Sequence, residues 1–219
     1  MKYSPEKKIG IGMCRHGNYP SECEACMHEN RPLSEKAQDV LDAVGLTWEK
    51  LEGKRLLEIG SGLAVLGQVA KEKGVDVVSL EKNPEMWGED GEVPKNIEYI
   101  VGDAEKIPLE DNSVEIVISK AAPPTISKTK EEVTNVIDEA MRILKPGGVF
   151  RFGPARMSYL GEVPLLTDKE EETFTSAQRA ERVLDKSLEV LQELYPSIQR
   201  INDEHGIGIF ELHKPSEEH

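Results

Sequence analysis

From about Leu33 onward, short apolar segments alternate with segments whose apolar residues recur at helical spacing. The apolar segments are rich in valine, isoleucine and leucine, as expected of strands that are buried on both faces. A chain in which such strands alternate with helices folds into one mostly parallel sheet that is covered by helices on both faces. The sequence therefore predicts an α/β fold.

Seven strands are expected in this sheet, at Arg55–Ile59, Asp76–Leu80, Ile97–Val101, Val114–Ser119, Val149–Phe152, Ser197–Ile201 and Gly206–His213. The last strand is expected to be antiparallel, because Asn202-Asp203-Glu204 favours a hairpin before it. Lys145-Pro146-Gly147-Gly148 is expected to form a turn before the fifth strand. The predicted helices are a leading helix with Ser34 as its N-cap, the stretch from Gly62 to Gly74, Lys130–Leu144 and Ala177–Tyr195.

The length and the charge limit the function classes. A chain of 219 residues suits one main domain, which we expect at 34–219, with residues 1–33 as a separate arm that contains cysteine and histidine. The formal net charge of -14 argues against binding duplex nucleic acid, since that needs a basic face. No apolar run approaches the roughly 20 residues of a membrane-spanning helix, and Met1–Lys8 lacks the apolar stretch of a secretory signal. We expect a cytoplasmic protein.

A glycine-rich loop follows the first predicted strand, in the run Leu56-Leu57-Glu58-Ile59-Gly60-Ser61-Gly62. Ligands of open α/β sheets bind at the carboxyl ends of strands, and glycines there allow the backbone to approach the ligand closely. Glu81 ends the second strand roughly 20 residues further on, where its carboxylate can accept hydrogen bonds from ribose hydroxyls. Together these features indicate a ligand that contains adenosine.

Two residues favour S-adenosylmethionine over a nicotinamide dinucleotide. The dinucleotide fingerprint requires a small residue three places after the second glycine, where this chain has Val65. Glu58, two residues before the first glycine, has no role with a dinucleotide but can bind the ammonium of a methionine moiety. An oxidoreductase that uses nicotinamide is therefore the weaker hypothesis.

Residues 51–152 resemble the class I S-adenosylmethionine-dependent methyltransferases, in particular the branch that methylates small molecules. Four stretches carry the resemblance: LLEIGSG, VVSLEKNP, VGDAEKIPLEDNSVEIVIS and AMRILKPGGVFRF. The resemblance implies that the glycine loop binds the methionine part, that the acid after the second strand binds the ribose, and that the acid after the third strand binds the adenine amino group. The residues at these positions are Glu58, Gly60, Ser61, Gly62, Glu81, Lys82, Asn83, Asp103 and Ala104, with Ser119 and Lys120 closing the site after the fourth strand.

Two departures from the family leave the acceptor open. Ala64 stands where many members have a third glycine, and the run Lys120-Ala121-Ala122-Pro123-Pro124 follows the fourth strand, where the family faces its substrate. No residue identifies itself as a general base, so none is assigned a catalytic role. We expect methyl transfer to a small-molecule or protein acceptor; the alternative is a non-catalytic protein that binds S-adenosylmethionine and docks a partner through its arm.

The arm contains every cysteine of the chain: Cys14, Cys23 and Cys26, together with His16 and His28. Cys-x-x-Cys thiolates, a third thiolate and one imidazole can hold zinc tetrahedrally, which points to Cys14, His16, Cys23 and Cys26, with His28 as the other possible fourth ligand. Iron–sulfur ligation and free thiols remain open as alternatives.

Overall fold

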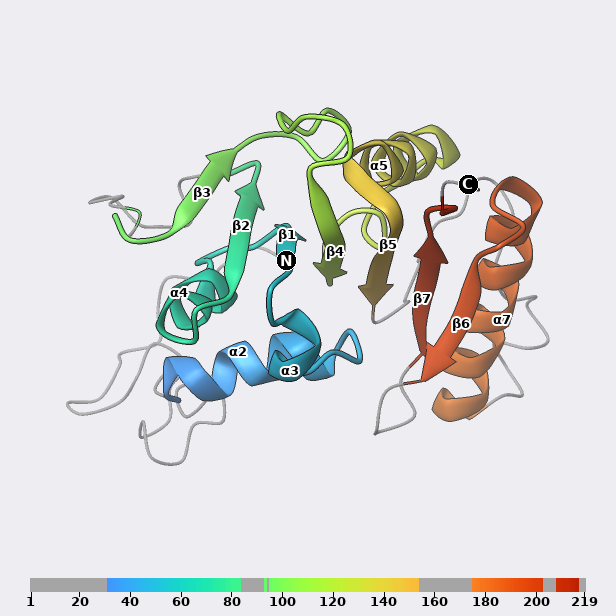
Figure 1. Ribbon diagram of the computed structural model, residues 1–219. Helices are drawn as coiled ribbons and strands as arrows, with labels where there is room; N and C mark the ends of the chain where they lie inside the picture. The colour runs from blue at the N-terminus through green and yellow to red at the C-terminus, as the bar shows by residue number, and fades with distance from the viewer. Residues whose placement is uncertain (1–30, 84–92, 94, 154–174, 203–207, 217–219) are drawn as a thin grey trace, which may run out of the picture.

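The structure, a computed structural model, describes residues 31–83, 93, 95–153, 175–202 and 208–216. One sheet of seven strands runs through the molecule in the order β3-β2-β1-β4-β5-β7-β6 (Figure 1). The strands are β1 (Arg55–Ile59), β2 (Asp76–Glu81), β3 (Glu98–Val101), β4 (Val114–Lys120), β5 (Leu144–Gly153), β6 (Gln199–Asn202) and β7 (Gly208–His213). The predicted α/β sheet is confirmed. Residues 1–30 of the predicted arm lie outside the described residues, and Leu33, its last residue, is the first residue of α2.

Strands β1 to β5 are parallel, and β7 alone is reversed, because it pairs antiparallel with both β5 and β6. The strand order reverses direction at β1, where the chain moves outward through β2 and β3 and then returns to β4 on the other side. The crevice between the carboxyl ends of β1 and β4 is thus a topological switch point. Such a point is the usual ligand site of an open α/β sheet.

Helices cover both faces of the sheet: α2 (Leu33–Asp42), α3 (Trp48–Leu51) and α4 (Val65–Glu72) on one face, and α5 (Lys130–Ile143) and α7 (Ser176–Leu194) on the other. On the first face, Leu41 and Leu66 pack with Ile116 and Ile118 of β4. On the second, Ile137 of α5 and the phenylalanines of β5 and β7 form the larger core. The alternation of apolar strands with helices in the sequence therefore produces two hydrophobic cores, one on each face of the sheet. Together they hold the sheet between two layers of helices.

Several element boundaries differ from the prediction. Helix α2 begins at Leu33 with Pro32 as its N-cap, so the predicted cap at Ser34 is wrong: the N–H groups of the first turn bond to the Pro32 carbonyl. Helix α3 was not predicted, because one turn is too short for a periodic pattern. Strand β5 begins at Leu144, not after the glycines, because Leu144 already pairs in register with Val114 of β4.

Among the described helices, none has both the length and the apolar character that would let it cross a membrane.

Candidate functional site

A cleft of about 530 Å³ opens at the carboxyl ends of β1, β2, β3 and β4. Its walls are the glycine loop after β1, the end of β2, the loop after β3 and the loop after β4, and α5 contributes Glu132 and Val136. Four strand ends and a helix thus meet at one edge of the sheet. The cleft lies where the switch point predicts a ligand.

The glycine loop is bonded to the neighbouring strand. The N–H groups of Gly60 and Ser61 both donate to the carbonyl of Leu80, at 2.9 and 3.0 Å. Gly60 has a φ of 69° and Gly62 a φ of 53°, a region that favours glycine. Ala64 also has a positive φ, of 46°. Glycine adopts this conformation more easily than alanine, which explains why many members of the family that the sequence resembles have glycine at this position. The loop therefore has a backbone shape that side chains rarely adopt.

Glycine at position 60 is also required by its neighbour. A Cβ added to Gly60 would lie 2.2 Å from the Cβ of Ala122, in the loop after β4. The two loops at the switch point are therefore in direct contact. Ala121, beside this contact, has a φ of 51°.

Glu81 ties the glycine loop to the end of β2. One carboxylate oxygen accepts from the N–H of Gly62 at 2.9 Å, and the other accepts from the N–H of Asn83 at 3.0 Å. Each carboxylate oxygen has a second lone pair that remains for a ligand. Since Glu81 also lines the cleft, it is placed to accept hydroxyl groups there.

Asp103 and Lys82 form an ion pair in the wall of the cleft. The Lys82 ammonium lies 2.7 Å from a carboxylate oxygen of Asp103, and the other oxygen accepts from the N–H of Glu105 at 3.1 Å. The hydrogen bond from Lys82 lowers the pKa of the Asp103 carboxyl, so this group is ionised at neutral pH. An ionised acceptor is therefore available at the end of β3.

Glu58 is buried at the end of β1, with 5% of its surface exposed. Its Oε2 has no hydrogen-bond partner among the described residues. Burial raises the pKa of this carboxyl to about 8, against the opposing effect of the Lys120 cation and with a further increase from Glu81. Burying a carboxyl group without a hydrogen-bond partner costs free energy. A positively charged ligand group beside Glu58 would offset this cost, so Glu58 is a candidate binding residue.

Two other predicted site residues at these strand ends have buried polar atoms without described partners. They are the hydroxyls of Ser61, in the glycine loop, and of Ser119, which pairs in register with Ile59. Buried polar groups are nearly always hydrogen-bonded in folded proteins. Three such groups, at the ends of β1 and β4 and in the glycine loop between β1 and α4, fit a ligand that carries several polar groups.

The structure thus brings most of the predicted cofactor residues together. Those that line the cleft are Gly60, Gly62, Glu81, Lys82, Asp103 and Ala104. Glu58, Ser61 and Ser119 do not line it but are buried at the adjoining strand ends. Sequence reasoning missed Glu105, although it follows Ala104 in a recognised stretch. It also missed Glu132 and Val136, because no motif marks them and α5 approaches the cleft only in three dimensions.

The predicted metal ligands Cys14, His16, Cys23 and Cys26 lie outside the described residues. Within the described ranges, no group of three or more His, Cys, Asp or Glu side chains could hold a metal ion.

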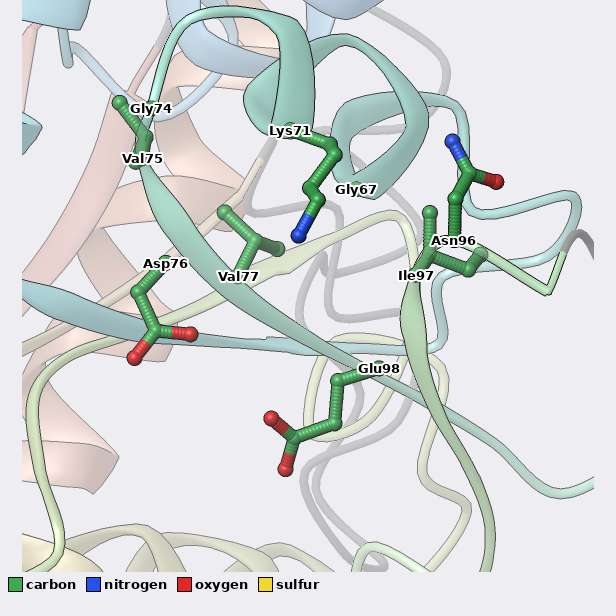
Figure 2. A pocket seen from close by; sticks show the side chains of 9 residues that line it. All are labelled: Gly67, Lys71, Gly74, Val75, Asp76, Val77, Asn96, Ile97 and Glu98. Carbon is green, nitrogen blue, oxygen red and sulfur yellow. The ribbon is translucent and has the colours of Figure 1, made fainter.

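A second, smaller pocket of about 350 Å³ lies at the opposite ends of β2 and β3. Figure 2 shows Lys71 reaching from α4 toward Val77, with Asp76 and Glu98 at the strand ends. Both of these carboxylates are paired with Arg55, at 3.3 and 2.6 Å. This pocket is remote from the switch point, and its acids already have partners.

The comparison with protein families agrees with this geometry. Residues 57–152 match the family described as a methyltransferase domain. This part of the chain is therefore similar to methyltransferase domains. The match runs from β1 to β5 and so includes all four strands whose ends form the cleft.

Curated relatives of the methyltransferase domain are methyltransferases. A demethylmenaquinone methyltransferase of Renibacterium salmoninarum is 27% identical over 158 residues, which is 64% of this chain and 65% of that protein. An uncharacterised methyltransferase of Mycobacterium tuberculosis is 34% identical over 96 residues, 43% of this chain and 37% of that protein. A phosphoethanolamine N-methyltransferase of Triticum aestivum is 36% identical over 106 residues, 44% of this chain and 20% of that protein. The chain therefore matches less than two thirds of the length of each.

Solved structures share the fold. A protein of Methanococcus maripaludis, proposed to be an S-adenosylmethionine-dependent methyltransferase, superposes with a TM-score of 0.54 at 18% identity, over 100% of this chain and 99% of that one. A protein of Pyrococcus horikoshii superposes with a TM-score of 0.53 at 20% identity, over 90% of this chain and 96% of that one. At these identities the likeness establishes the fold alone.

Proposed function

We propose that the chain transfers a methyl group from S-adenosylmethionine to a small-molecule acceptor. The observation that carries this proposal is the group of unpartnered polar atoms around the glycine loop, next to a cleft that contains Glu81 and Asp103. A nucleoside joined to an amino acid carries hydroxyls, an exocyclic amine and an ammonium. Each of these groups is a hydrogen-bond donor that a carboxylate at the site could accept.

The residues fit the donor as follows. Glu81 would accept the ribose hydroxyls through its remaining lone pairs, and Asp103 would accept the adenine amino group. Glu58 would bind the ammonium, which satisfies a buried oxygen that has no described partner. When bound, the donor supplies a methyl group that its sulfonium has already activated. The protein's contribution is then to hold the acceptor in line with that methyl group.

The support for a small-molecule acceptor comes from the relatives. Two of them are named for methylating demethylmenaquinone and phosphoethanolamine. No side chain is assigned as a general base, because positioning alone suffices for an acceptor that is unprotonated at neutral pH. A protein acceptor remains the second choice.

Calorimetric titration with S-adenosylhomocysteine tests the donor site, with NADH titrated in parallel as the comparator. We expect saturable binding of S-adenosylhomocysteine and none of NADH. Absence of S-adenosylhomocysteine binding, or preferential binding of NADH, would overturn the proposal. Formation of S-adenosylhomocysteine from S-adenosylmethionine in the presence of pooled quinones, amines and carboxylic acids then tests transfer; binding without transfer to any pool would favour a non-catalytic binding protein.

We also infer that Cys14, His16, Cys23 and Cys26 bind one zinc ion, with His28 as the other candidate for the fourth ligand. The inference rests on the clustering of every cysteine with two histidines, since thiolate and imidazole are the ligands that zinc prefers. Metal analysis of the purified full chain should find zinc, and the Cys23→Ser/Cys26→Ser variant should lack it. Iron in place of zinc, or no metal in the wild-type chain, would refute the inference.

A further inference from the structure

The loop between β3 and β4, residues 102–113, joins the wall of the cleft to helix α5. Its first part, residues 102–105, lines the cleft. Its next part is seated on the helix, because Ile107 is only 3% exposed and belongs to the same core cluster as Val136 and Ala140 of α5. The position of the cleft wall therefore depends on how the rest of the loop is held against α5.

The guanidinium of Arg142 on α5 binds the middle of this loop. Nη2 donates to the carbonyl of Ile107 at 2.8 Å, and Nη1 donates to the carbonyl of Leu109 at 2.9 Å and to the carboxylate of Asp111 at 2.7 Å. Nε and Nη2 also donate to the carboxylate of Glu139, at 2.9 and 2.8 Å. The five N–H groups of an arginine are thus all matched with acceptors, which the three N–H groups of a lysine could not do.

Glu139 and Asn135 extend this contact along α5. Glu139 accepts the N–H of Ile107 at 2.8 Å, so Ile107 is held through both its N–H and its carbonyl. Asn135 donates to the carboxylate of Glu105 at 2.9 Å. Residues 135, 139 and 142 recur at helical spacing, so they lie on one face of the helix. This face binds the loop from the cleft wall to its middle.

The part of the loop that Arg142 holds packs back on the first residue of the loop. A Cβ added to Gly102 would lie 3.2 Å from Cδ of Pro108, closer than an ordinary van der Waals contact. Pro108 stands between the two residues whose carbonyls accept from Arg142. Gly102 immediately precedes Asp103. A movement of the middle of the loop away from α5 would therefore remove the packing behind Asp103.

Arg142 is not among the described residues that line the cleft, so it can affect a ligand there only through the loop. We propose that Arg142 is a positioning residue for adenine recognition: it holds the loop after β3 so that Asp103 and the backbone of Ala104 meet the adenine ring. The inference rests on the proposed function, in which Asp103 accepts the adenine amino group. It adds a side chain behind the cleft wall that determines specificity for the base.

The test compares two ligands that differ only at the base. S-adenosylhomocysteine carries the adenine amino group, whereas S-inosylhomocysteine carries a carbonyl oxygen there, which an ionised Asp103 repels. The wild-type chain should therefore prefer S-adenosylhomocysteine. Arg142→Met removes all five N–H groups and should reduce this preference roughly ten-fold, the scale of one charge-assisted hydrogen bond to the ligand. Calorimetry measures both affinities, and the change should lie mainly in the affinity for S-adenosylhomocysteine.

Arg200→Met is the matched control. Arg200 also binds two carboxylates, those of Glu181 and Asp185, but it lies on β6 at the far edge of the sheet from β3 (Figure 1). Its loss should lower the stability and leave the ratio of the two affinities at its wild-type value. Thermal unfolding reports whether each variant is folded, and Arg142→Lys replaces the methionine variant if that one is not. The lysine variant should change the ratio in the same direction, because its three N–H groups cannot match five acceptors.

A double variant tests whether Arg142 acts through the loop that carries Asp103. Asp103→Ala alone should lower the preference for S-adenosylhomocysteine, as Arg142→Met does. Arg142→Met/Asp103→Ala should lower it by less than the product of the two single effects, since one substitution removes what the other serves to position. Two effects that multiply would mean that the residues act independently.

Three results would overturn the inference and leave the proposed donor site intact: an unchanged ratio in a folded Arg142 variant, an equal loss of both ligands, or independent effects in the double variant. A wild-type chain that does not distinguish the two ligands would overturn it as well. Failure of the wild-type chain to bind S-adenosylhomocysteine would instead refute the proposed function.

Discussion

The N–H of Gly62 donates a hydrogen bond of 2.9 Å to the carboxylate of Glu81, so the end of β2 fixes the shape of the glycine loop. The same carboxylate accepts the N–H of Asn83 and lines the cleft. Glu81 therefore has two roles that one substitution removes together. It shapes the loop in the free protein, and in the proposed function it accepts the ribose hydroxyls.

Replacing Glu81 by alanine should lower both stability and donor affinity. Loss of two hydrogen bonds to a charged acceptor should reduce the free energy of unfolding by about 1–3 kcal/mol. Affinity for S-adenosylhomocysteine should fall more than about ten-fold. Glu81→Gln keeps one acceptor oxygen and should lie between alanine and wild type in both measurements. Urea unfolding measures the free energy of unfolding, and calorimetry measures the affinity for S-adenosylhomocysteine. Wild-type affinity in the alanine variant would show that the ribose does not reach Glu81.

Replacing Gly60 by alanine should be far more damaging than the same change at Gly53. Both glycines have a positive φ, 69° and 68°, so alanine is strained at either position. A Cβ at position 53 meets nothing within 4 Å, whereas one at position 60 overlaps Ala122. Gly53→Ala should therefore cost about 1–2 kcal/mol of backbone strain and leave donor binding intact. Gly60→Ala should cost more and abolish binding of S-adenosylhomocysteine; equal effects at the two positions would contradict the contact with Ala122.

Glu58 should make the protein less stable as the pH rises. Burial raises the pKa of its carboxyl from 4.5 to about 8, and the charged groups that face it are Lys120 on β4 and Glu81 on β2. Between these two pKa values the unfolded chain loses the proton while the folded chain keeps it, so stability falls through this window and the full penalty is present above about pH 8. At roughly 1.4 kcal/mol per pKa unit, the penalty is at most about 5 kcal/mol.

The variant Glu58→Gln removes this titration. Relative to wild type it should gain stability between pH 5 and pH 9, which urea unfolding at a series of pH values measures. The comparison with wild type cancels the other titrating groups. A constant difference between the two proteins across the series would mean that Glu58 is ionised in the folded state at neutral pH.

The strands of the central sheet could be predicted from the sequence because each is a short segment rich in leucine, valine and isoleucine between helical segments. Arg55–Ile59 is one such segment, and the structure has β1 at these residues. The start of α2 could not be predicted, because Ser34 has the side chain of a cap while the preceding Pro32 carbonyl already accepts the first N–H groups. The start of β5 depends on the pairing of Leu144 with Val114, a residue far away in the sequence, which no local pattern reveals.

The residues of the candidate site that lie at strand ends could be predicted, whereas those on α5 and in the loop after β4 could not. Glu81 and Asp103 follow strands directly, so the end of a predicted strand places them at the carboxyl edge of the sheet. Glu132 lies on α5, and helical periodicity indicates only which side of a helix is buried, not which cleft it borders. The contact between Gly60 and Ala122 likewise joins two loops whose spacing in the sequence carries no signal.

Arg151 joins the leading helices to the sheet, and its removal should be among the most destabilising single changes. Its guanidinium lies 2.6 Å from Glu211 of β7 and donates to the carbonyl of Gly45, between α2 and α3, also at 2.6 Å. The side chains of Arg151 and Glu211 are only 16% and 12% exposed, so Arg151→Met leaves a largely buried carboxylate with His213, at 3.0 Å, as its one remaining described side-chain partner. We expect a loss of about 3–5 kcal/mol in the free energy of unfolding.

Two further variants test whether the stability lost in Arg151→Met comes from the buried ion pair. The double variant Arg151→Met/Glu211→Leu should lose less than the Arg151 variant alone, because it leaves no buried charge behind. Lys186→Met breaks the exposed ion pair with Glu189 and should cost no more than about 1 kcal/mol, since water screens that pair. If Arg151→Met cost as little as Lys186→Met in urea unfolding, the α2–α3 connection would be held to the sheet by apolar packing alone.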